Sequence, residues 1–204
     1  MEKKSQTIYL AIDVEKKGAK FEHPVIQIGV AWGTSLSSME KGSFCFDYKD
    51  KPFEQRCFDE FWSKQDAVYK RICAEAVEPA EQWRTFKAFL DTLELSGDKV
   101  EIISDNPAYD VEAIDYHLNE ELGRQGLRYS SGMKYRCVHD SSERVKGLPA
   151  HYAEAIEKKA QSLAKHTHWA ADDAEYILVH FFLTKTVIDT LREAEDKVKA
   201  LLTV

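Results

Sequence analysis

An apolar stretch that ends in two acids constrains the fold of this chain more than any other feature. The sequence TIYLAIDVEKKG, from Thr7 to Gly18, begins like a strand that is covered on both faces and then reaches Asp13 and Glu15, one residue apart. Because side chains alternate across a strand, the two acids share one face, while the opposite layer receives Leu10, Ile12 and Val14. Two neighbouring anions repel, and burial increases the cost. The pair is therefore either solvated at a strand end or shares a divalent cation.

The remaining pattern predicts an α/β fold with a mixed sheet of about five strands flanked by helices. After residues 7–15, further strands are expected at His23–Gly33, Gly42–Tyr48, Asp98–Asp105 and Lys134–Asp140. Short connections favour an antiparallel meander for the first three strands. Helices are expected over Phe58–Leu95, with a break at Ala76–Pro79, and over Asp110–Leu122, Ala150–Lys165 and Trp169–Leu202.

Length and composition set the remaining expectations. The 204 residues contain no repeat and no linker, which predicts one domain over residues 1–204. No run of about 18 apolar residues exists, so we expect no membrane span and no membrane partner. The four cysteines are scattered without a C-x-x-C pair, which indicates a reducing intracellular compartment, the cytoplasm. The net charge of −7 does not exclude a polyanionic partner, because acids that bind metal count as negative in the sequence.

A further acid follows the strand in ISDNPAYD, from Ile103 to Asp110. Taken alone, Asp110 is an ordinary first-turn acid that the helix dipole favours. Asp105 and Asn106 are equally plausible as turn formers.

A third polar segment, HTHWAADDAEY, runs from His166 to Tyr176. His168 lies just before a long predicted helix, and Asp172 and Asp173 fall in its first turn. A histidine near a helix end is usually a surface or capping residue, and first-turn acids are common. Each signal is ordinary by itself, but the number and order of the three segments are not.

The three segments form an ordered set: D-x-E on the first strand, N-x-x-Y-D after a later strand, and H-x-x-x-x-D near the end of the chain. This set resembles the DEDDh 3′–5′ exonucleases, a branch of the ribonuclease H-like superfamily. The resemblance extends over roughly residues 7–182 and implies a ribonuclease H-like sheet. It matches the first motif to Asp13 and Glu15, the second to Asp110, and the third to His168 with Asp173.

The spacing of the third motif favours the histidine branch of that family. A sister branch carries tyrosine four residues before the last aspartate, where this chain has Trp169. His168 lies five residues before Asp173, as the histidine branch requires, and His166 and Asp172 are the competing choices.

The resemblance implies a metal-dependent exonuclease that removes nucleotides from the 3′ end of single-stranded RNA or DNA. Two Mg²⁺ or Mn²⁺ ions are implied because the ligands are all carboxylates. Asp13 would bridge both ions, Glu15 and Asp173 would complete one, and Asp110 would hold the second. His168 would act as general base, and the implied partner is a nucleic acid with a free 3′ end.

Substrate contacts are expected close to the motifs. The backbone around Val14–Lys16 and residue Asn106 would contact the terminal sugar. Phosphate contacts, or simply a solvated rim, are expected from Lys16, Lys17, Lys20, Arg124, Arg128, Lys134 and Arg136. In RCFDEFWSKQ, from Arg56 to Gln65, Phe61 and Trp62 are either core residues or platforms for a base.

Two other functions compete with the nuclease hypothesis. A catalytically idle protein could keep the exonuclease fold and act as a nucleic-acid or protein binding module. An acidic helical interaction protein with coincidental motifs is disfavoured by the strand-rich first half. The oligomeric state is left open, with a homodimer among the alternatives.

Overall fold

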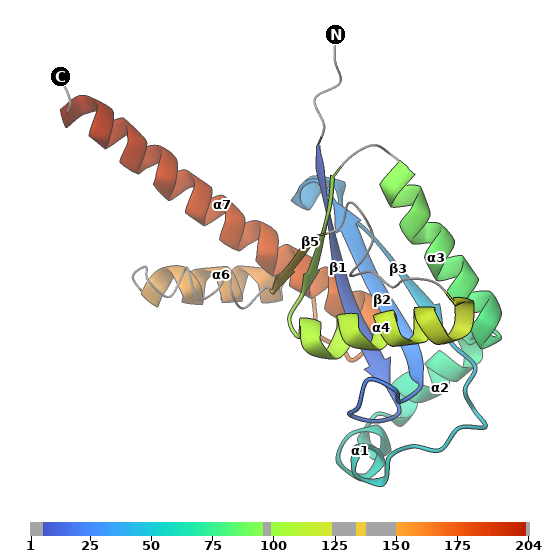
Figure 1. Ribbon diagram of the computed structural model, residues 1–204. Coiled ribbons are helices and arrows are strands. Elements are labelled where there is room, and N and C mark those ends of the chain that lie inside the picture. The colour runs from blue at the N-terminus through green and yellow to red at the C-terminus, as the bar shows by residue number, and fades with distance from the viewer. Residues whose placement is uncertain (1–5, 96–98, 124–133, 138–149, 203–204) are drawn as a thin grey trace.

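The computed structural model describes residues 6–95, 99–123, 134–137 and 150–202 (Figure 1). Its sheet has the order β3-β2-β1-β4-β5. The antiparallel meander is confirmed, since β2 pairs with β1 on one side and β3 on the other, whereas β4 runs parallel to β1 and β5. The strands are β1 (Thr7–Lys16), β2 (Val25–Gly33), β3 (Glu40–Cys45), β4 (Lys99–Ser104) and the short β5 (Lys134–Cys137). The predicted mixed α/β class is therefore confirmed.

The helices depart from the predicted bounds in ways that local chemistry explains. Helix α4 begins at Pro107 rather than Asp110, because proline suits the first helical position. The helix predicted from Phe58 is divided by a tight turn, η2 (Trp62–Lys64). The end predicted for β5, residues 138–140, lies outside the described residues. The full set comprises η1 (Leu36–Ser38), α1 (Gln55–Glu60), η2, α2 (Asp66–Glu75), α3 (Pro79–Leu95), α4 (Pro107–Leu122), α6 (Ala150–Leu163) and α7 (Ala170–Leu202).

The two faces of the sheet carry different layers, as Figure 1 shows. On one face, the alternate β1 residues pack with α3 and α4 in a core that contains Leu10, Ile12, Val14, Trp83 and Ile114. On the other face, small side chains of the strands pack against α7 in a core that contains Ala11, Ala31, Ile177, Leu178 and Phe181. The alternation predicted for β1 is confirmed, and it directs Asp13 and Glu15 to the α7 side.

The beginning of α7 lies directly on the backbone of β2. Gly29 is the register partner of Asp13, and a Cβ atom built on it would lie 1.9 Å from the carbonyl carbon and oxygen of Ala170. Only glycine permits this approach. The side-chain oxygen of Gln27 accepts a hydrogen bond of 3.2 Å from the Ala170 N–H. These two contacts place the first turn of α7 next to the acids of β1.

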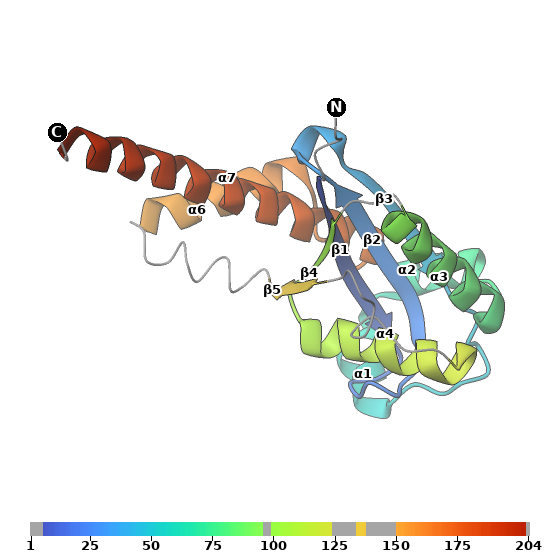
Figure 2. The same cartoon turned by 45° about the horizontal axis from the view of Figure 1, so that its top comes forward.

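The first half of α7 covers the sheet, and the rest of the helix continues beyond it (Figure 2). Its buried residues end at Thr184, while Leu201 and Leu202 are exposed. No helix in the described ranges is both long and apolar enough to cross a bilayer. Three of the cysteines, Cys45, Cys57 and Cys73, are free thiols.

Candidate active site

Three of the predicted acids meet at the end of β1. One carboxylate oxygen from each of Asp13, Glu15 and Asp173 lies within 4.8 Å of the other two. The first two acids come from one face of β1, and Asp173 comes from the first turn of α7. The close packing of α7 on Gly29 brings these segments together, although about 160 residues of the sequence separate them.

The electrostatics of this triad favour the loss of negative charge. Burial, followed by the charges of Glu15, Asp110 and Asp173, raises the pKa of Asp13 well above its ordinary value. Burial and the charges of Asp173 and Asp110 do the same to the pKa of Glu15. Burial also raises the pKa of Asp173, although hydrogen bonds from backbone N–H groups oppose it. The triad therefore binds either protons or cations in preference to remaining charged.

Asp110 lies beside the triad in the first turn of α4 and is almost fully buried. Burial raises its pKa to about 7, although the Ser104 hydroxyl and the Val14 N–H, which both donate to its carboxylate, act in the opposite direction. Ser104 also accepts a hydrogen bond of 3.0 Å from the Asn106 N–H, which fixes the turn between β4 and α4. The charge of Asp110 adds to the negative potential at Asp13 and Glu15. Its own carboxylate, however, accepts hydrogen bonds from Ser104 and Val14.

The two adjacent acids of α7 have separate surroundings. Asp173 is buried and accepts hydrogen bonds from the backbone N–H groups of Thr167, at 2.7 Å, and His168, at 3.0 Å. Asp172 faces outward, where its carboxylate binds Lys41 at 2.7 Å and the Thr167 hydroxyl at 3.0 Å. Asp173 is therefore the acid directed to the triad, and Asp172 belongs to a surface ion pair with Lys41.

Both histidines of the third motif lie close to Asp173. His166 Nε2 is 3.5 Å from an Asp173 oxygen, and a nitrogen of His168 belongs with them to a group whose atoms lie within 4.8 Å of one another. The His168 backbone has φ = 62°, a left-handed conformation that side-chain-bearing residues seldom adopt. The His168 ring also meets the edge of Phe61, with centroids 5.0 Å apart. Proximity does not separate the two histidines, so the choice of His168 as base stays a prediction.

A cavity of about 480 Å³ opens on the triad between the end of the sheet and helices α6 and α7. Its lining includes Asp13, Asp173, His166 and Tyr176. Asp105, interpreted from the sequence as a turn former, also lines it and contributes to the raised pKa of Asp13 and Asp110. Its place directly after a strand, ahead of Asp110, is the one sequence signal that could have identified it.

The donor set fits a hard divalent cation. The triad offers carboxylate oxygens only, which Mg²⁺ and Mn²⁺ prefer, and burial together with mutual repulsion raises the pKa values of Asp13 and Glu15. A bound cation would relieve both the repulsion and the cost of burial.

The two residues predicted to contact the sugar lie at different places. The Val14 side chain packs in the α3–α4 core, and its N–H is directed to the Asp110 carboxylate. Asn106 lies at the start of α4 and lines a second hollow of about 430 Å³, next to Lys20 and Tyr109. Substrate contact by either residue stays a prediction.

The expectation that Lys16 and Lys17 form a phosphate-binding or solvated rim is wrong, because both side chains are 1% exposed. The Lys17 ammonium donates hydrogen bonds of 2.6 Å to the carbonyls of Tyr48 and Lys51. The Lys16 ammonium lies 3.5 Å from the centre of the Tyr109 ring and donates to the Lys20 carbonyl. Burial lowers the pKa of Lys16 to about 8.

Of the other proposed cations, Lys20 is exposed. Arg124 and Arg128 lie outside the described residues, as do the side chains of Lys134 and Arg136.

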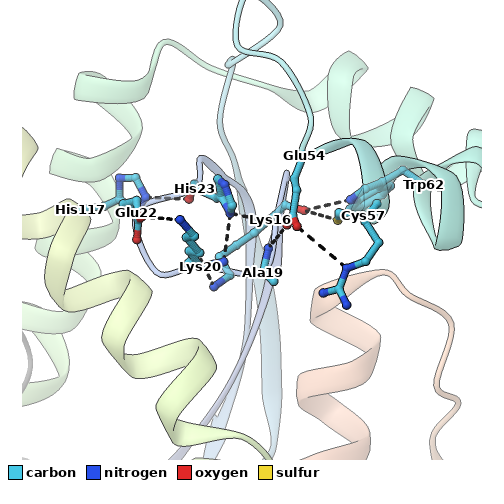
Figure 3. Close-up of polar contacts among 10 residues, drawn as sticks. Lys16, Ala19, Lys20, Glu22, His23, Glu54, Cys57, Trp62 and His117 are labelled. Carbon is cyan, nitrogen blue, oxygen red and sulfur yellow. Dashed lines mark hydrogen bonds and ion pairs between the residues drawn. The ribbon is translucent and has the colours of Figure 1, made fainter.

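Trp62 contacts the backbone at the end of β1, as Figure 3 shows. Its indole N–H donates a hydrogen bond of 2.9 Å to the carbonyl of Lys16, the residue that follows Glu15. The side chain is 2% exposed, so Trp62 is a core residue rather than a platform for a base. Its neighbour Phe61 is half-buried against His168.

Comparison with known proteins finds similarity in structure and none in sequence families. No family model and no curated protein matches the chain. Solved structures of Escherichia coli exonuclease I do match. A zinc-bound complex with single-stranded DNA has a TM-score of 0.67 and 14% identity, over 96% of this chain and 45% of that one. A complex with a dA16 oligonucleotide has a TM-score of 0.66 and 14% identity, over 98% and 46%. A complex with a labelled dT13 oligonucleotide has a TM-score of 0.65 and 16% identity, over 98% and 46%.

These matches assign the fold of exonuclease I to the chain, which spans a little less than half the length of those structures. The predicted exonuclease type of fold is thereby confirmed. At such low identity the matches carry no residue roles.

Proposed function

We propose that this protein is a metal-dependent 3′–5′ exonuclease that acts on single-stranded nucleic acid. The observation that carries the proposal is the partly buried meeting of Asp13, Glu15 and Asp173, with Asp110 adjacent, in a fold shared with exonuclease I. Four acids from three separate segments are costly to gather unless a cation binds them. The single-stranded DNA held by the similar exonuclease I structures supports the class of substrate.

Two divalent ions, Mg²⁺ or Mn²⁺, would supply an activated water and neutralise charge on the scissile phosphate. Asp13 would contact both ions, because the charges of Glu15, Asp173 and Asp110 all act on its carboxylate. Glu15 and Asp173 would complete one ion site, and Asp110 would contribute to the other. The hydrogen bond from Ser104 would keep the Asp110 carboxylate directed toward the site.

The residues around the third motif would control the proton that the attacking water loses. His168 would accept it, since an imidazole changes its charge near working pH. The left-handed backbone at His168 costs roughly 1–2 kcal/mol, which the two backbone hydrogen bonds to Asp173 help to offset. Strain retained at one residue beside a carboxylate cluster is typical of functional sites and supports this role.

The test uses matched DNA and RNA oligonucleotides that carry a label at the 5′ end. In Mg²⁺ or Mn²⁺ we expect progressive shortening of at least one of them, and in EDTA no shortening. The Asp13→Asn variant is the matched control, because its side chain has nearly the same shape but no charge. It should fold and remain inactive.

Intact oligonucleotides with every metal and both sugars, from a protein that metal still stabilises, would refute the nuclease proposal. That result would leave the idle binding module as the explanation. Activity of the Asp13→Asn variant equal to wild type would equally refute it.

A further inference from the structure

A second group of metal-binding side chains lies at the approach to α7, on the side of Asp173 that faces the two histidines. A ring nitrogen from each of His166 and His168 and an oxygen of Asp173 all lie within 4.8 Å of one another. The two imidazole rings are 4.8 Å apart and nearly perpendicular, at 89°. Perpendicular rings can direct one nitrogen each toward a common point without contact between their faces.

The spacing is close to that of a tetrahedral transition-metal site. Ligands about 2.1 Å from a zinc ion are roughly 3.4 Å from one another. His166 Nε2 and the Asp173 oxygen are already 3.5 Å apart. To complete the triangle, the His168 nitrogen has to shorten its distances to the other two ligand atoms from at most 4.8 Å to about 3.4 Å, a change of the size that side-chain rotation produces. Three protein ligands would leave the fourth position open to water.

The loop before α7 already holds one of these ligands in place. The N–H groups of Thr167 and His168 fix the Asp173 carboxylate, and each of its oxygens keeps a further lone pair. His166 is 54% exposed at its side chain, so an ion can reach it from solvent.

We infer that His166, His168 and Asp173 form a binding site for a transition-metal ion of intermediate softness, and that this ion is Zn²⁺. The donors decide the metal: two imidazoles and one carboxylate suit Zn²⁺, whereas the carboxylates of Asp13 and Glu15 suit Mg²⁺. The two sites share Asp173, and His166 belongs only to the zinc site.

This arrangement has a regulatory consequence, which rests on the proposed function. An ion held by His168 occupies the nitrogen that would accept the proton, and it also engages one carboxylate of the magnesium set. Zn²⁺ should therefore inhibit the Mg²⁺-dependent exonuclease.

The primary test measures binding and does not depend on activity. Metal-free protein is titrated with ZnCl₂ in a calorimeter without Mg²⁺, and Co²⁺ is used in parallel because its visible absorption reports tetrahedral nitrogen and oxygen ligands. The variants are His166→Ala and, as a matched control, His151→Ala, which removes an exposed histidine of α6 outside the cluster. Melting temperatures of the metal-free proteins establish that both variants fold.

Wild type and His151→Ala should bind one zinc ion tightly. Because loss of an outer partner of a ligand costs 10–100-fold in metal affinity, loss of His166 itself should cost about 100-fold or more. Mg²⁺ binding should not change in His166→Ala. Equal zinc affinity in wild type and His166→Ala, or a Co²⁺ complex without tetrahedral absorption, would overturn the inference.

The inference and the proposed function fail separately. A protein without nuclease activity that binds zinc through His166 would refute only the proposed function. An active exonuclease whose zinc affinity does not depend on His166 would refute only the zinc site.

Discussion

Replacement of Asp110 by asparagine should stabilise the metal-free protein at neutral pH. Burial raises the pKa of this carboxyl from 3.8 to about 7, so the folded protein holds a proton that the unfolded chain releases. The stabilisation that this bound proton contributes is fully present below about pH 4 and is lost as the pH rises through about 7. Each pKa unit corresponds to about 1.4 kcal/mol, so ionised Asp110 destabilises the fold by about 4 kcal/mol.

Asparagine removes that cost and keeps an acceptor for the Ser104 hydroxyl. The charge assistance of the hydrogen bonds from Ser104 and Val14 is already included in the net pKa shift. Asparagine, however, offers one acceptor oxygen where the carboxylate offers two, and a weakened hydrogen bond from either donor costs about 2 kcal/mol. We therefore expect a net gain of about 2 kcal/mol at pH 8, or roughly 4–8 °C in melting temperature for a chain of this length.

The assay is urea unfolding in EDTA between pH 5 and pH 8.5. Wild type should lose about 2 kcal/mol between pH 5 and pH 7 through this residue, whereas Asp110→Asn should change less. Mg²⁺ should reverse the order, because the variant lacks one ligand. Asp172→Asn is a control that should change stability in the opposite direction. Burial raises the pKa of Asp172, but hydrogen bonds from Lys41 and Thr167 outweigh burial and lower it overall. Loss of this carboxylate should therefore destabilise the protein.

A variant at Asp110 that is less stable than wild type at pH 8 in EDTA would refute the reasoning. A wild-type protein with constant stability between pH 5 and pH 8 would do the same, since all four acids of the site have raised pKa values.

Three further substitutions test how the site is held. Gly29→Ala should displace the first turn of α7 and destabilise the protein by about 3 kcal/mol in urea unfolding. Mg²⁺ should then raise the melting temperature of this variant by less than it raises that of wild type. An equal rise in both proteins would contradict the role given to this contact. Asparagine tolerates a left-handed backbone, so His168→Asn should keep the fold while lowering turnover about 10²-fold or more. Calorimetry should show a Mg²⁺ affinity close to wild type; full activity, or the same loss only in His166→Ala, would reassign the base. Trp62→Phe leaves the buried Lys16 carbonyl without its indole donor and should cost about 1–3 kcal/mol in the same unfolding assay; a neutral result would show that the bond contributes nothing.

Local pattern was enough to predict the orientation of the acids. The alternation of β1 fixes which face receives Asp13 and Glu15, and the long helix after His168 follows from its apolar spacing. The motif spacing implied by the family resemblance favours Asp173 over Asp172, and the ion pair that holds Asp172 to Lys41 agrees with that choice. These features depend on neighbours in the sequence, which is why the sequence alone reveals them.

The rest depends on partners that are distant in sequence. Lysines after a carboxylate pair resemble a phosphate-binding rim, but Lys17 is buried by carbonyls about 30 residues away, and Lys16 by the ring of Tyr109. The hydrophobic periodicity of the sequence does not predict the close contact of Gly29 with α7, nor the hydrogen bond from Trp62 to the Lys16 carbonyl. Burial of a charged side chain is decided by tertiary contacts, so composition and local pattern mislead there.

The most direct test of the central claim follows the shortening of a 5′-labelled strand in Mg²⁺, with wild type and Asp13→Asn side by side. The account predicts a ladder that shortens one nucleotide at a time from a free 3′ end, no change in a strand with a blocked 3′ hydroxyl, and no ladder from the variant. Cuts within a circular substrate, cleavage in EDTA, or a ladder from Asp13→Asn would contradict it.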